Sequence, residues 1–322
     1  MSPDSAILQA ADYSARHWLS LEQGPLRPGT EEHKRAVAAM FQATFNPYKP
    51  SVIEWPKLDA AAHARLLSLP IWDIAVQTEG KAGLRMKSYA AQLADQDMRA
   101  AIELNAWEEG RHKEVLSHLV AAYGIAMAPE PEYLVPRDAE WAYLVTGFSE
   151  CIDSFFAFGL FELARRSGFF PPELVETFEP VMQEECRHIL LFANWLAWHR
   201  RTIRWWQRPW FELRVAAAWA FLAWERLRLA KGLGGSSDAG APDNNFTISG
   251  AQAVGDGGVN TAELMDLCLA ENDRRFAGYD ARLARPTTVP WLVRLARRLM
   301  RRSKRADRAD TRAGSNRNAP RE

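Results

Sequence analysis

Apolar and polar residues follow a helical period through most of the chain after residue 70. Apolar positions recur every three or four residues, and strand-type alternation is almost absent. Four long segments carry this pattern, over about 70–93, 97–123, 138–168 and 171–199. Their short connections favour an all-α fold, an antiparallel four-helix bundle over residues 70–200.

Residues with strong preferences for helix ends mark several of the expected boundaries. Asp97 is predicted to cap the second segment and Gly124 to end it. Gly168 is expected to close the third segment, and the pair Pro171 and Pro172 to open the fourth.

Additional N- and C-terminal helices are expected on either side of the bundle. Residues 1–69 contain short helical stretches interrupted by proline, which predicts an N-terminal wrapping segment. Residues 201–305 are expected to form a C-terminal helical extension. Its parts are helices over Arg201–Lys231, 261–283 and 290–305, and a flexible Gly/Ser-rich loop over 232–260. The polar residues 306–322 are expected to be a disordered tail.

A five-residue motif occurs twice within the predicted bundle. Residues 108–112 in the second helix and 184–188 in the fourth both read Glu-Glu-x-Arg-His. A single Glu-x-x-His triplet arises readily by chance, whereas two copies of the longer pattern are hard to attribute to accident. The repeated motif is therefore the best candidate for the chemistry of the protein.

The spacing within the motif places a carboxylate and an imidazole on one face of each helix. Positions i and i+3 point in similar directions, so Glu109 accompanies His112 and Glu185 accompanies His188. Both pairs fall on apolar stripes. A carboxylate buried there is costly unless it is paired or bound to a metal ion.

Two further carboxylates are expected from the first and third helices at matching depth. Glu79 is the only acidic residue central to the first helix. Glu150 and Glu162 compete in the third helix. Antiparallel packing about the turn near residues 168–171 favours Glu150, because its distance from that turn is closer to that of Glu185.

With these residues the chain resembles the ferritin-like di-iron carboxylate superfamily over residues 70–200. Its ligand order is similar to that of bacterial multicomponent monooxygenase hydroxylase subunits and ribonucleotide reductase small subunits. The resemblance implies two Fe ions, with Mn or a mixed Fe/Mn pair as the alternative, because O and N ligands serve both metals. The implied ligands are Glu79, Glu109, His112, Glu150, Glu185 and His188.

The resemblance also implies roles for residues beside these ligands. Glu108 and Glu184 match acidic positions that orient a ligand imidazole, and Arg111 and Arg187 are expected to pair with carboxylates behind the site. Ser154 stands where the monooxygenases carry a threonine, so it is a candidate for proton delivery. Simple back-bonding of its hydroxyl to the helix is the alternative.

Some positions depart from particular members of the superfamily. Leu116 replaces the tyrosine of radical-generating reductase subunits, and Val181 replaces the additional histidine of arylamine N-oxygenases. The chain has three cysteines and no Cys-x-x-Cys pair of the rubredoxin type. A metal-free alternative pairs Glu109 with Arg187 and Glu185 with Arg111 in buried salt bridges.

The leading functional hypothesis is oxygen activation, with O2 as a co-substrate and an apolar organic molecule as the substrate. Aromatic residues of the third helix are expected to line the substrate pocket, namely Phe148, Phe155, Phe156 and Phe158. The chain has no Gly-x-Gly-x-x-Gly element, and its three cysteines cannot bind an iron–sulfur cluster, so a separate reductase is expected to supply electrons. The alternatives are a ferroxidase or iron-binding protein without organic substrate, and a peroxide-consuming protein of the rubrerythrin or dimanganese catalase type.

Charge and targeting features constrain the partners. Forty basic and forty acidic residues argue against a dedicated nucleic-acid binder. No N-terminal leader is apparent, which predicts a cytoplasmic location. The Trp- and Arg-rich segments Arg201–Lys231 and Trp291–Arg305 suggest membrane-surface contact, although packing on the bundle is the favoured interpretation. The first of them is also a candidate docking face for an acidic electron donor, and a homodimer stays open.

Overall fold

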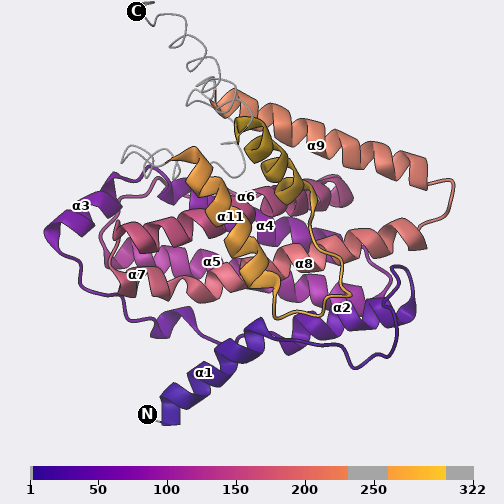
Figure 1. Cartoon of the computed structure of the whole chain (residues 1–322), viewed down its shortest axis with the longest axis horizontal. Coiled ribbons are helices and arrows are strands. Elements are labelled where there is room, and N and C mark those ends of the chain that lie inside the picture. The colour runs from indigo at the N-terminus through magenta and orange to yellow at the C-terminus, as the bar shows by residue number, and fades with distance from the viewer. Residues whose placement is uncertain (1–2, 231–259, 302–322) are drawn as a thin grey trace, which may run out of the picture.

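The computed structural model describes residues 3–230 and 260–301, and its regular elements are helices (Figure 1). The only strand-like pairing in these residues is an isolated bridge between Trp18 and Tyr279. The prediction of an all-α fold is confirmed. The expected loop over 232–260 lies outside the described residues except for Asn260, and the expected tail over 306–322 lies wholly outside them.

Four long helices form the centre of the molecule. They are α4 (Trp72–Ala90), α5 (Gln96–Ala122), α6 (Ala139–Ser167) and α8 (Glu179–Thr202). Helix α4 packs along α5, α6 packs along α8, and further contacts join α4 to α6 and α5 to α8. The main hydrophobic core lies among them and includes Met98, Ile102, Phe158 and Trp195. The two copies of the motif therefore face each other across this core.

The capping residues agree with the sequence at most helix ends. Gly168 adopts φ +65° after α6, a conformation that glycine accepts without strain, and Gly124 does the same after α5. Helix α5 begins earlier than expected. Its cap is Asp95, whose side chain accepts a hydrogen bond from the Met98 backbone N–H at 3.1 Å, so the assignment of Asp97 was wrong.

The fourth predicted helix is interrupted. A short helix, α7 (Pro172–Thr177), is followed by a non-helical turn at Phe178, and α8 begins at Glu179. Pro180 has no backbone N–H and cannot donate to the carbonyl one turn earlier, which explains the break. The interruption lets Phe178 turn toward a cavity between the helices.

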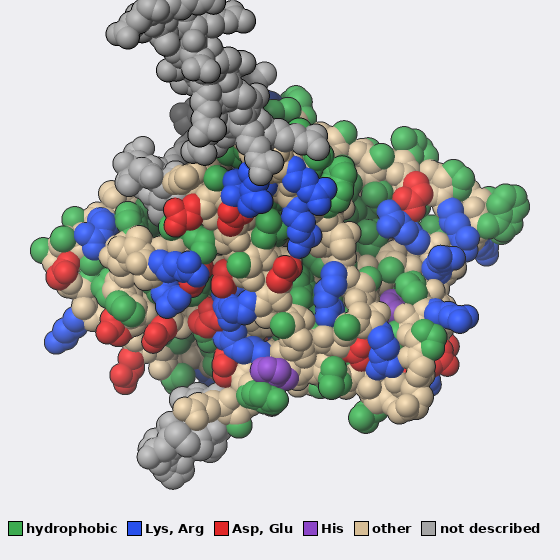
Figure 2. All heavy atoms as spheres, in the orientation of Figure 1, with side chains coloured by type: hydrophobic (Ala, Val, Ile, Leu, Met, Phe, Trp, Pro, Cys, Tyr) green, Lys and Arg blue, Asp and Glu red, His purple; other side chains and the backbone are tan. Residues whose placement is uncertain are grey.

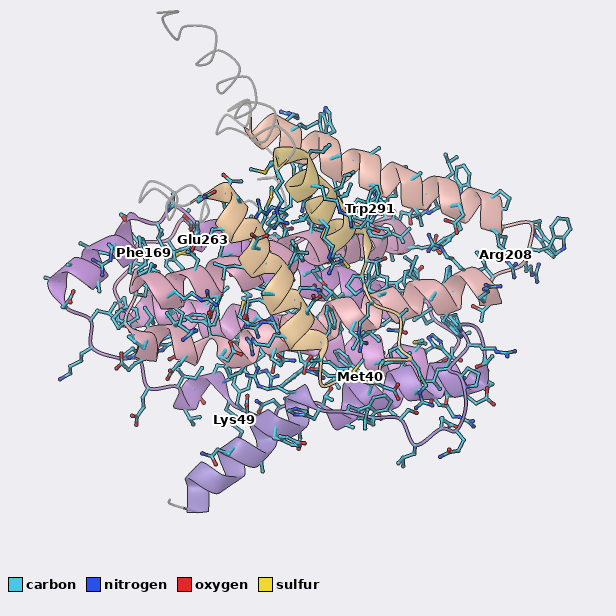
Figure 3. All side chains as sticks on the ribbon, in the orientation of Figure 1. Met40, Lys49, Phe169, Arg208, Glu263 and Trp291 are labelled. Atoms are coloured by element: carbon cyan, nitrogen blue, oxygen red, sulfur yellow. The ribbon has the colours of Figure 1, made fainter. Side chains whose placement is uncertain are left out.

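The N-terminal part of the chain packs on the outside of the motif helices. It contains α1 (Pro3–Arg16), α2 (Glu31–Ala43), the 3-10 turn η1 (Pro50–Val52) and α3 (Ala60–Ser68). Helix α2 contacts both α5 and α8. Figure 3 labels Met40 in the last part of α2 and Lys49 directly before η1, and the connecting segment runs between them. This segment is placed behind the two motif arginines.

The C-terminal helices cover α6 and α8. Helix α9 (Arg208–Ala230) lies on α6, α11 (Thr261–Phe276) crosses α6, and residues 288–301 form a last helix. The helix expected over 261–283 is shorter, because the chain turns after Phe276 to approach the N-terminal segment. A Cβ at Gly278 would lie 2.0 Å from the Arg16 carbonyl oxygen, so only glycine fits this approach.

Helix α6 is long and apolar enough to cross a membrane by length and composition alone. However, 72% of its apolar window is buried inside the protein, as expected for the central helix of a bundle. Its hydrophobicity is therefore explained by the core.

Candidate metal centre

Four motif side chains meet in the interior of the bundle. Glu109 and His112 come from α5, and Glu185 and His188 come from α8; one potential ligand atom from each lies within 4.8 Å of all the others. The two imidazole rings are 5.3 Å apart between centroids. This buried group of two carboxylates and two imidazoles could hold a metal ion. It is compatible with a two-iron site in a helical protein.

Each histidine is oriented by a glutamate from the opposite motif helix. His112 Nε2 lies 2.8 Å from Glu184 Oε2 of α8, and His188 Nε2 lies 2.9 Å from Glu108 Oε2 of α5. The Nε2–H of each ring donates a hydrogen bond to the carboxylate that it faces, which leaves the Nδ1 lone pair of each neutral ring directed to the centre. The predicted role of Glu108 and Glu184 is thus consistent with the geometry.

The inner nitrogens face carboxylate oxygens without hydrogen bonds. His188 Nδ1 is 2.8 Å from Glu109 Oε1, yet neither atom has a hydrogen-bond partner. His112 Nδ1 is 3.2 Å from Glu185 Oε1 and also has none. Two acceptors at such distances repel each other unless a cation or an additional proton lies among them. The donor set therefore fits a metal ion.

The raised pKa values of Glu109 and His112 also indicate that the cluster favours bound positive charge. The pKa of Glu109 is raised well above its usual range by burial and by the nearby carboxylates of Glu79 and Glu185. Burial lowers the pKa of His112, but the nearby carboxylates of Glu184, Glu185 and Glu79 outweigh it and raise this pKa. Protons are thus drawn into the cluster, and a metal cation would take their place.

The motif arginines hold the outer glutamates. Arg187 donates from Nη1 to Glu108 Oε1 at 2.8 Å, and Arg111 donates to Glu184. Burial alone would raise the pKa of Glu108. The Arg187 charge and the His188 hydrogen bond outweigh this effect and lower the pKa to about 2. The arginines do not form the pairs with Glu109 and Glu185 that the metal-free alternative required. The inner carboxylates are left for another cation.

Residues from the N-terminal segment complete this outer layer and were missed by sequence reasoning. Arg187 Nε donates to Thr44 Oγ1 at 2.7 Å, and its Nη2 donates to the Phe41 carbonyl at 2.6 Å. Tyr48 donates its hydroxyl to Glu184 Oε2 at 3.2 Å, and Arg111 stacks over the Tyr48 ring. These contacts join residues more than 60 positions apart and carry no local sequence signal.

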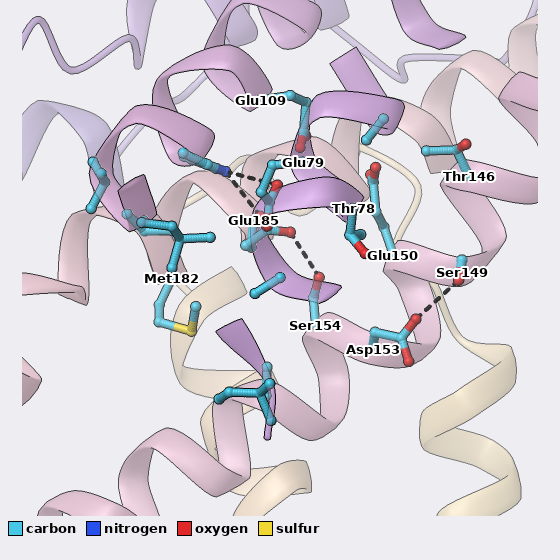
Figure 4. A pocket seen from close by; sticks show the side chains of 18 of the residues that line it. Thr78, Glu79, Glu109, Thr146, Ser149, Glu150, Asp153, Ser154, Met182 and Glu185 are labelled. Atoms are coloured by element: carbon cyan, nitrogen blue, oxygen red, sulfur yellow. Dashed lines mark hydrogen bonds and ion pairs between the residues drawn. The ribbon is translucent and has the colours of Figure 1, made fainter. Parts of the chain in front are cut away.

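The two additional carboxylates point to the same space (Figure 4). Glu79 Oε2 of α4 lies 3.8 Å from His112 Nδ1. Glu150 of α6 is buried, and neither of its carboxylate oxygens has a hydrogen-bond partner. Burial raises its pKa, and the charges of Glu109 and Glu185 raise it further. The structure thus brings all six predicted ligands to one place, with Glu79 and Glu150 at the rim of the four-residue cluster.

We expect Glu150→Ala to reduce metal binding far more than Glu162→Ala. Glu150 faces the cluster, whereas Glu162 does not line the cavity and forms ion pairs with Arg165 and Arg166. Loss of one carboxylate ligand should lower the metal content of the iron-loaded protein by roughly half or more, and Glu162→Ala should leave it unchanged. Elemental analysis and optical spectra of both variants measure this, and the reverse ranking would show that the register of α6 is misassigned.

A cavity of about 150 Å³ adjoins the cluster between α4, α5, α6 and α8. Glu79, Glu109, His112, Glu150 and Glu185 form part of its wall (Figure 4). Most of the remaining wall is apolar and includes Trp72, Ala75, Val115, Leu116, Val145, Phe178, Val181 and Met182. A compact apolar molecule in this cavity would lie against the carboxylates.

The aromatic residues expected to line the pocket are elsewhere, so that prediction was wrong. Phe148 packs against Phe192 and Trp219, Phe155 packs in a cluster with Cys268, and Phe158 lies beneath the guanidinium of Arg275. Phe156 packs on the same cluster as Phe155. These side chains lie on the sides of α6 that face α8, α9 and α11, whereas the cavity adjoins the side that carries Glu150 and Ser154.

Ser154 directs its hydroxyl to the cluster. It donates to Glu185 Oε2 at 3.0 Å, an interaction that the alternative of helix back-bonding did not include (Figure 4). Leu116 and Val181, the positions of the absent tyrosine and additional histidine, both line the cavity. These substitutions therefore add apolar surface next to the cluster.

A polar strip on α6 was also missed. Ser149 donates to Asp153 Oδ2 at 2.9 Å, and Arg226 of α9 binds the same oxygen at 2.7 Å. Both α6 residues line the cavity together with Thr146 and Arg85. The acidic residue three positions after Glu150 in an apolar helix was the available signal.

No protein-family model, no curated protein and no solved structure matches this chain. The metal centre therefore rests on the geometry of the chain's own residues.

Proposed function

We propose that the protein is an O2-activating oxidoreductase that uses two bound iron ions to oxidise a small apolar organic substrate. The observation that supports this proposal is the contact between the buried Glu/His cluster and the apolar cavity of about 150 Å³. A cavity of roughly this volume accepts a molecule the size of benzene. The substrate class is accordingly a compact hydrocarbon or an apolar group of that size.

In this proposal the six carboxylate and imidazole side chains hold the metal pair. When bound, the pair would supply electrons for the reduction of O2. The buried walls exclude water and hold the substrate beside the carboxylates. Ser154, hydrogen-bonded to Glu185, is placed to pass a proton at the Glu185 carboxylate, and Glu108 and Glu184 keep both imidazoles in the orientation that binds metal.

The electrons come from a separate donor. Insertion of one oxygen atom into a C–H bond, with reduction of the other atom to water, needs two electrons beyond those of the substrate. The chain offers no cluster of cysteines, since Cys151, Cys186 and Cys268 are single buried thiols. A reductase or ferredoxin-like protein is therefore part of the proposed reaction.

The test is oxygen incorporation in the iron-loaded protein with an excess of chemical reductant. Wild-type protein, ¹⁸O2 and a series of small arenes and alkanes should give oxygenated products detected by mass spectrometry. Ala75→Phe, which fills the cavity, should lower product formation at least tenfold while metal content stays close to wild type. Ala121→Phe on the exposed surface of α5 is the matched control.

A different result would favour the ferroxidase alternative. In that case ferric iron accumulates during repeated additions of Fe²⁺ and O2, no organic product forms, and Ala75→Phe leaves the rate of iron oxidation unchanged. Rapid consumption of hydrogen peroxide without organic product would instead favour the peroxide-consuming alternative.

A further inference from the structure

Helix α9 carries apolar side chains on two opposite faces. The inner face packs on the bundle through Phe211, Val215, Ala218 and Leu222, each at most 8% exposed. On the opposite face Trp210, Leu213, Trp224 and Leu227 are 63%, 57%, 53% and 60% exposed. At 100° per residue these four positions fall within an arc of about 100°. An apolar stripe of this length on an exposed helix face requires an explanation.

Tryptophans in the preceding turn extend the stripe. Trp205 is 74% exposed and Trp206 is 55% exposed. Together with the four exposed residues of α9 they are called the α9 outer face. Figure 2 shows hydrophobic and basic side chains together at the end of the molecule where α9 begins. Tryptophan is the residue most suited to a boundary between an apolar and an aqueous phase.

The surroundings of the α9 outer face are strongly basic. Residues 200–230 contain seven arginines and two glutamates. Arg214 and Arg226 are paired with Asp138 and Asp153, and Arg200 is paired with Glu212, so the remaining four arginines supply the charge of this face. The exposed arginines Arg201, Arg204 and Arg208 stand at one end of the face, and Arg228 stands at the other. Arginines flanking an apolar stripe bind phosphate groups while their stems cover apolar surface.

The helix over 288–301 adds a second surface of the same kind. Its inner residues Val289 and Val293 pack in one cluster that also contacts Trp219 of α9, and Figure 3 shows Trp291 beside α9. Trp291 and Leu299 are 59% and 56% exposed. Four arginines and no acidic residue occur between positions 288 and 301. Two neighbouring helices thus combine exposed apolar residues with positive charge.

The charge decides among the partners that could cover this surface. A second copy of the chain would bring an equally basic surface against it, and like charges would oppose the contact. An anionic lipid surface offers both an apolar layer and phosphate groups of opposite charge. We propose that the α9 outer face binds an anionic membrane surface, with the tryptophans at the depth of the headgroups and the arginines on lipid phosphates.

The orientation that follows is that of a helix lying in the membrane plane. The inner face of α9 stays on the bundle, so the body of the protein takes the place of the polar face of an ordinary amphipathic helix. The bundle remains in water above the lipid. This binding is independent of the metal centre and of the proposed oxidation.

The experiment measures binding of the full chain to vesicles by co-sedimentation. Wild-type protein should bind vesicles with about 30 mol% phosphatidylserine at least tenfold more tightly than phosphatidylcholine vesicles, and added salt should weaken that binding. Leu213→Glu should reduce the partition coefficient roughly tenfold or more. Leu134→Glu is the matched control, because Leu134 is 81% exposed in the connection between α5 and α6.

Circular dichroism checks whether both variants stay folded, which is expected for two exposed positions. The proposal is overturned if wild-type protein fails to bind anionic vesicles, or if Leu213→Glu and Leu134→Glu reduce binding equally. It is also overturned if light scattering shows a wild-type dimer that Leu213→Glu dissociates, because the face would then be covered by a second copy.

Discussion

Glu185→Ala is expected to lose most of the metal that the wild-type protein binds. Wild-type protein after anaerobic iron loading should contain close to two metal ions per chain, in keeping with a carboxylate-bridged pair. Removing Glu185 takes away a carboxylate that faces His112 at 3.2 Å, and the metal content should fall below about half an ion per chain. Glu109→Ala should have the same effect. Elemental analysis of desalted protein gives the result.

Glu173→Ala provides the control, since Glu173 is exposed on α7 and belongs neither to the cluster nor to the cavity wall. It should bind as much metal as the wild type. Full occupancy in Glu185→Ala, or no metal in reconstituted wild-type protein, would remove the six-residue model of the centre.

Arg187→Met is expected to be the most destabilising single change outside the inner cluster. Arg187 and Glu108 are both fully buried, so the variant removes the arginine that lies 2.8 Å from this carboxylate and leaves only the more distant Arg111, at 3.5 Å. Breaking such a pair costs about 3–5 kcal/mol of unfolding free energy. Urea unfolding of the metal-free proteins near pH 7 measures the difference without a contribution from metal binding.

Two comparisons separate the charge from the loss of packing. Arg166→Met removes an exposed partner of Glu162 and should cost less than about 1 kcal/mol. The double variant Arg187→Met with Glu108→Gln should recover part of the loss, because it replaces the Glu108 carboxylate by a neutral amide. Equal costs for Arg187→Met and Arg166→Met would mean that Glu108 is not held as an anion.

The stabilisation that the Glu108–Arg187 pair gives to the folded protein is expected to decrease at low pH. The pKa of Glu108 is lowered to about 2 from a usual value of 4.5, so its interaction with Arg187 stabilises the folded protein above pH 4.5. This contribution is lost as the pH falls through the folded-state value. The difference in stability between wild type and Arg187→Met should therefore shrink as the pH decreases from about 5 toward 2.

The sequence was informative wherever a feature repeats with the period of a helix. The spacing of Glu109 and His112 predicted a shared face, and the distance from the turn near residue 168 was enough to prefer Glu150 over Glu162. The all-α fold followed from the same periodicity. These features depend only on helix geometry, which is local and regular.

Features that depend on contacts between distant segments were not predictable in this way. The Phe41 carbonyl binds Arg187, and a carbonyl is present at every residue, so no sequence pattern marks it. The side of α6 that faces the cavity depends on how α9 and α11 cover the remainder of the helix. The four phenylalanines were therefore assigned to the wrong surface. Pro180 was a sequence signal for the break at Phe178, but nothing in the sequence showed that Phe178 would line the cavity.

Helices α5 and α8 each supply the glutamate that orients the histidine of the other helix, so a shortened form of the protein would lose one of these partners. A fragment that ends after α5 would retain Glu79, Glu109 and His112, but His112 would lose the Glu184 carboxylate that fixes its ring. A fragment beginning at α6 would likewise lack the Glu108 partner of His188. Neither half can therefore orient its own imidazole for metal binding. Metal affinity should appear only when the α4–α5 and α6–α8 halves are both present, as an all-or-none property of the assembled pair.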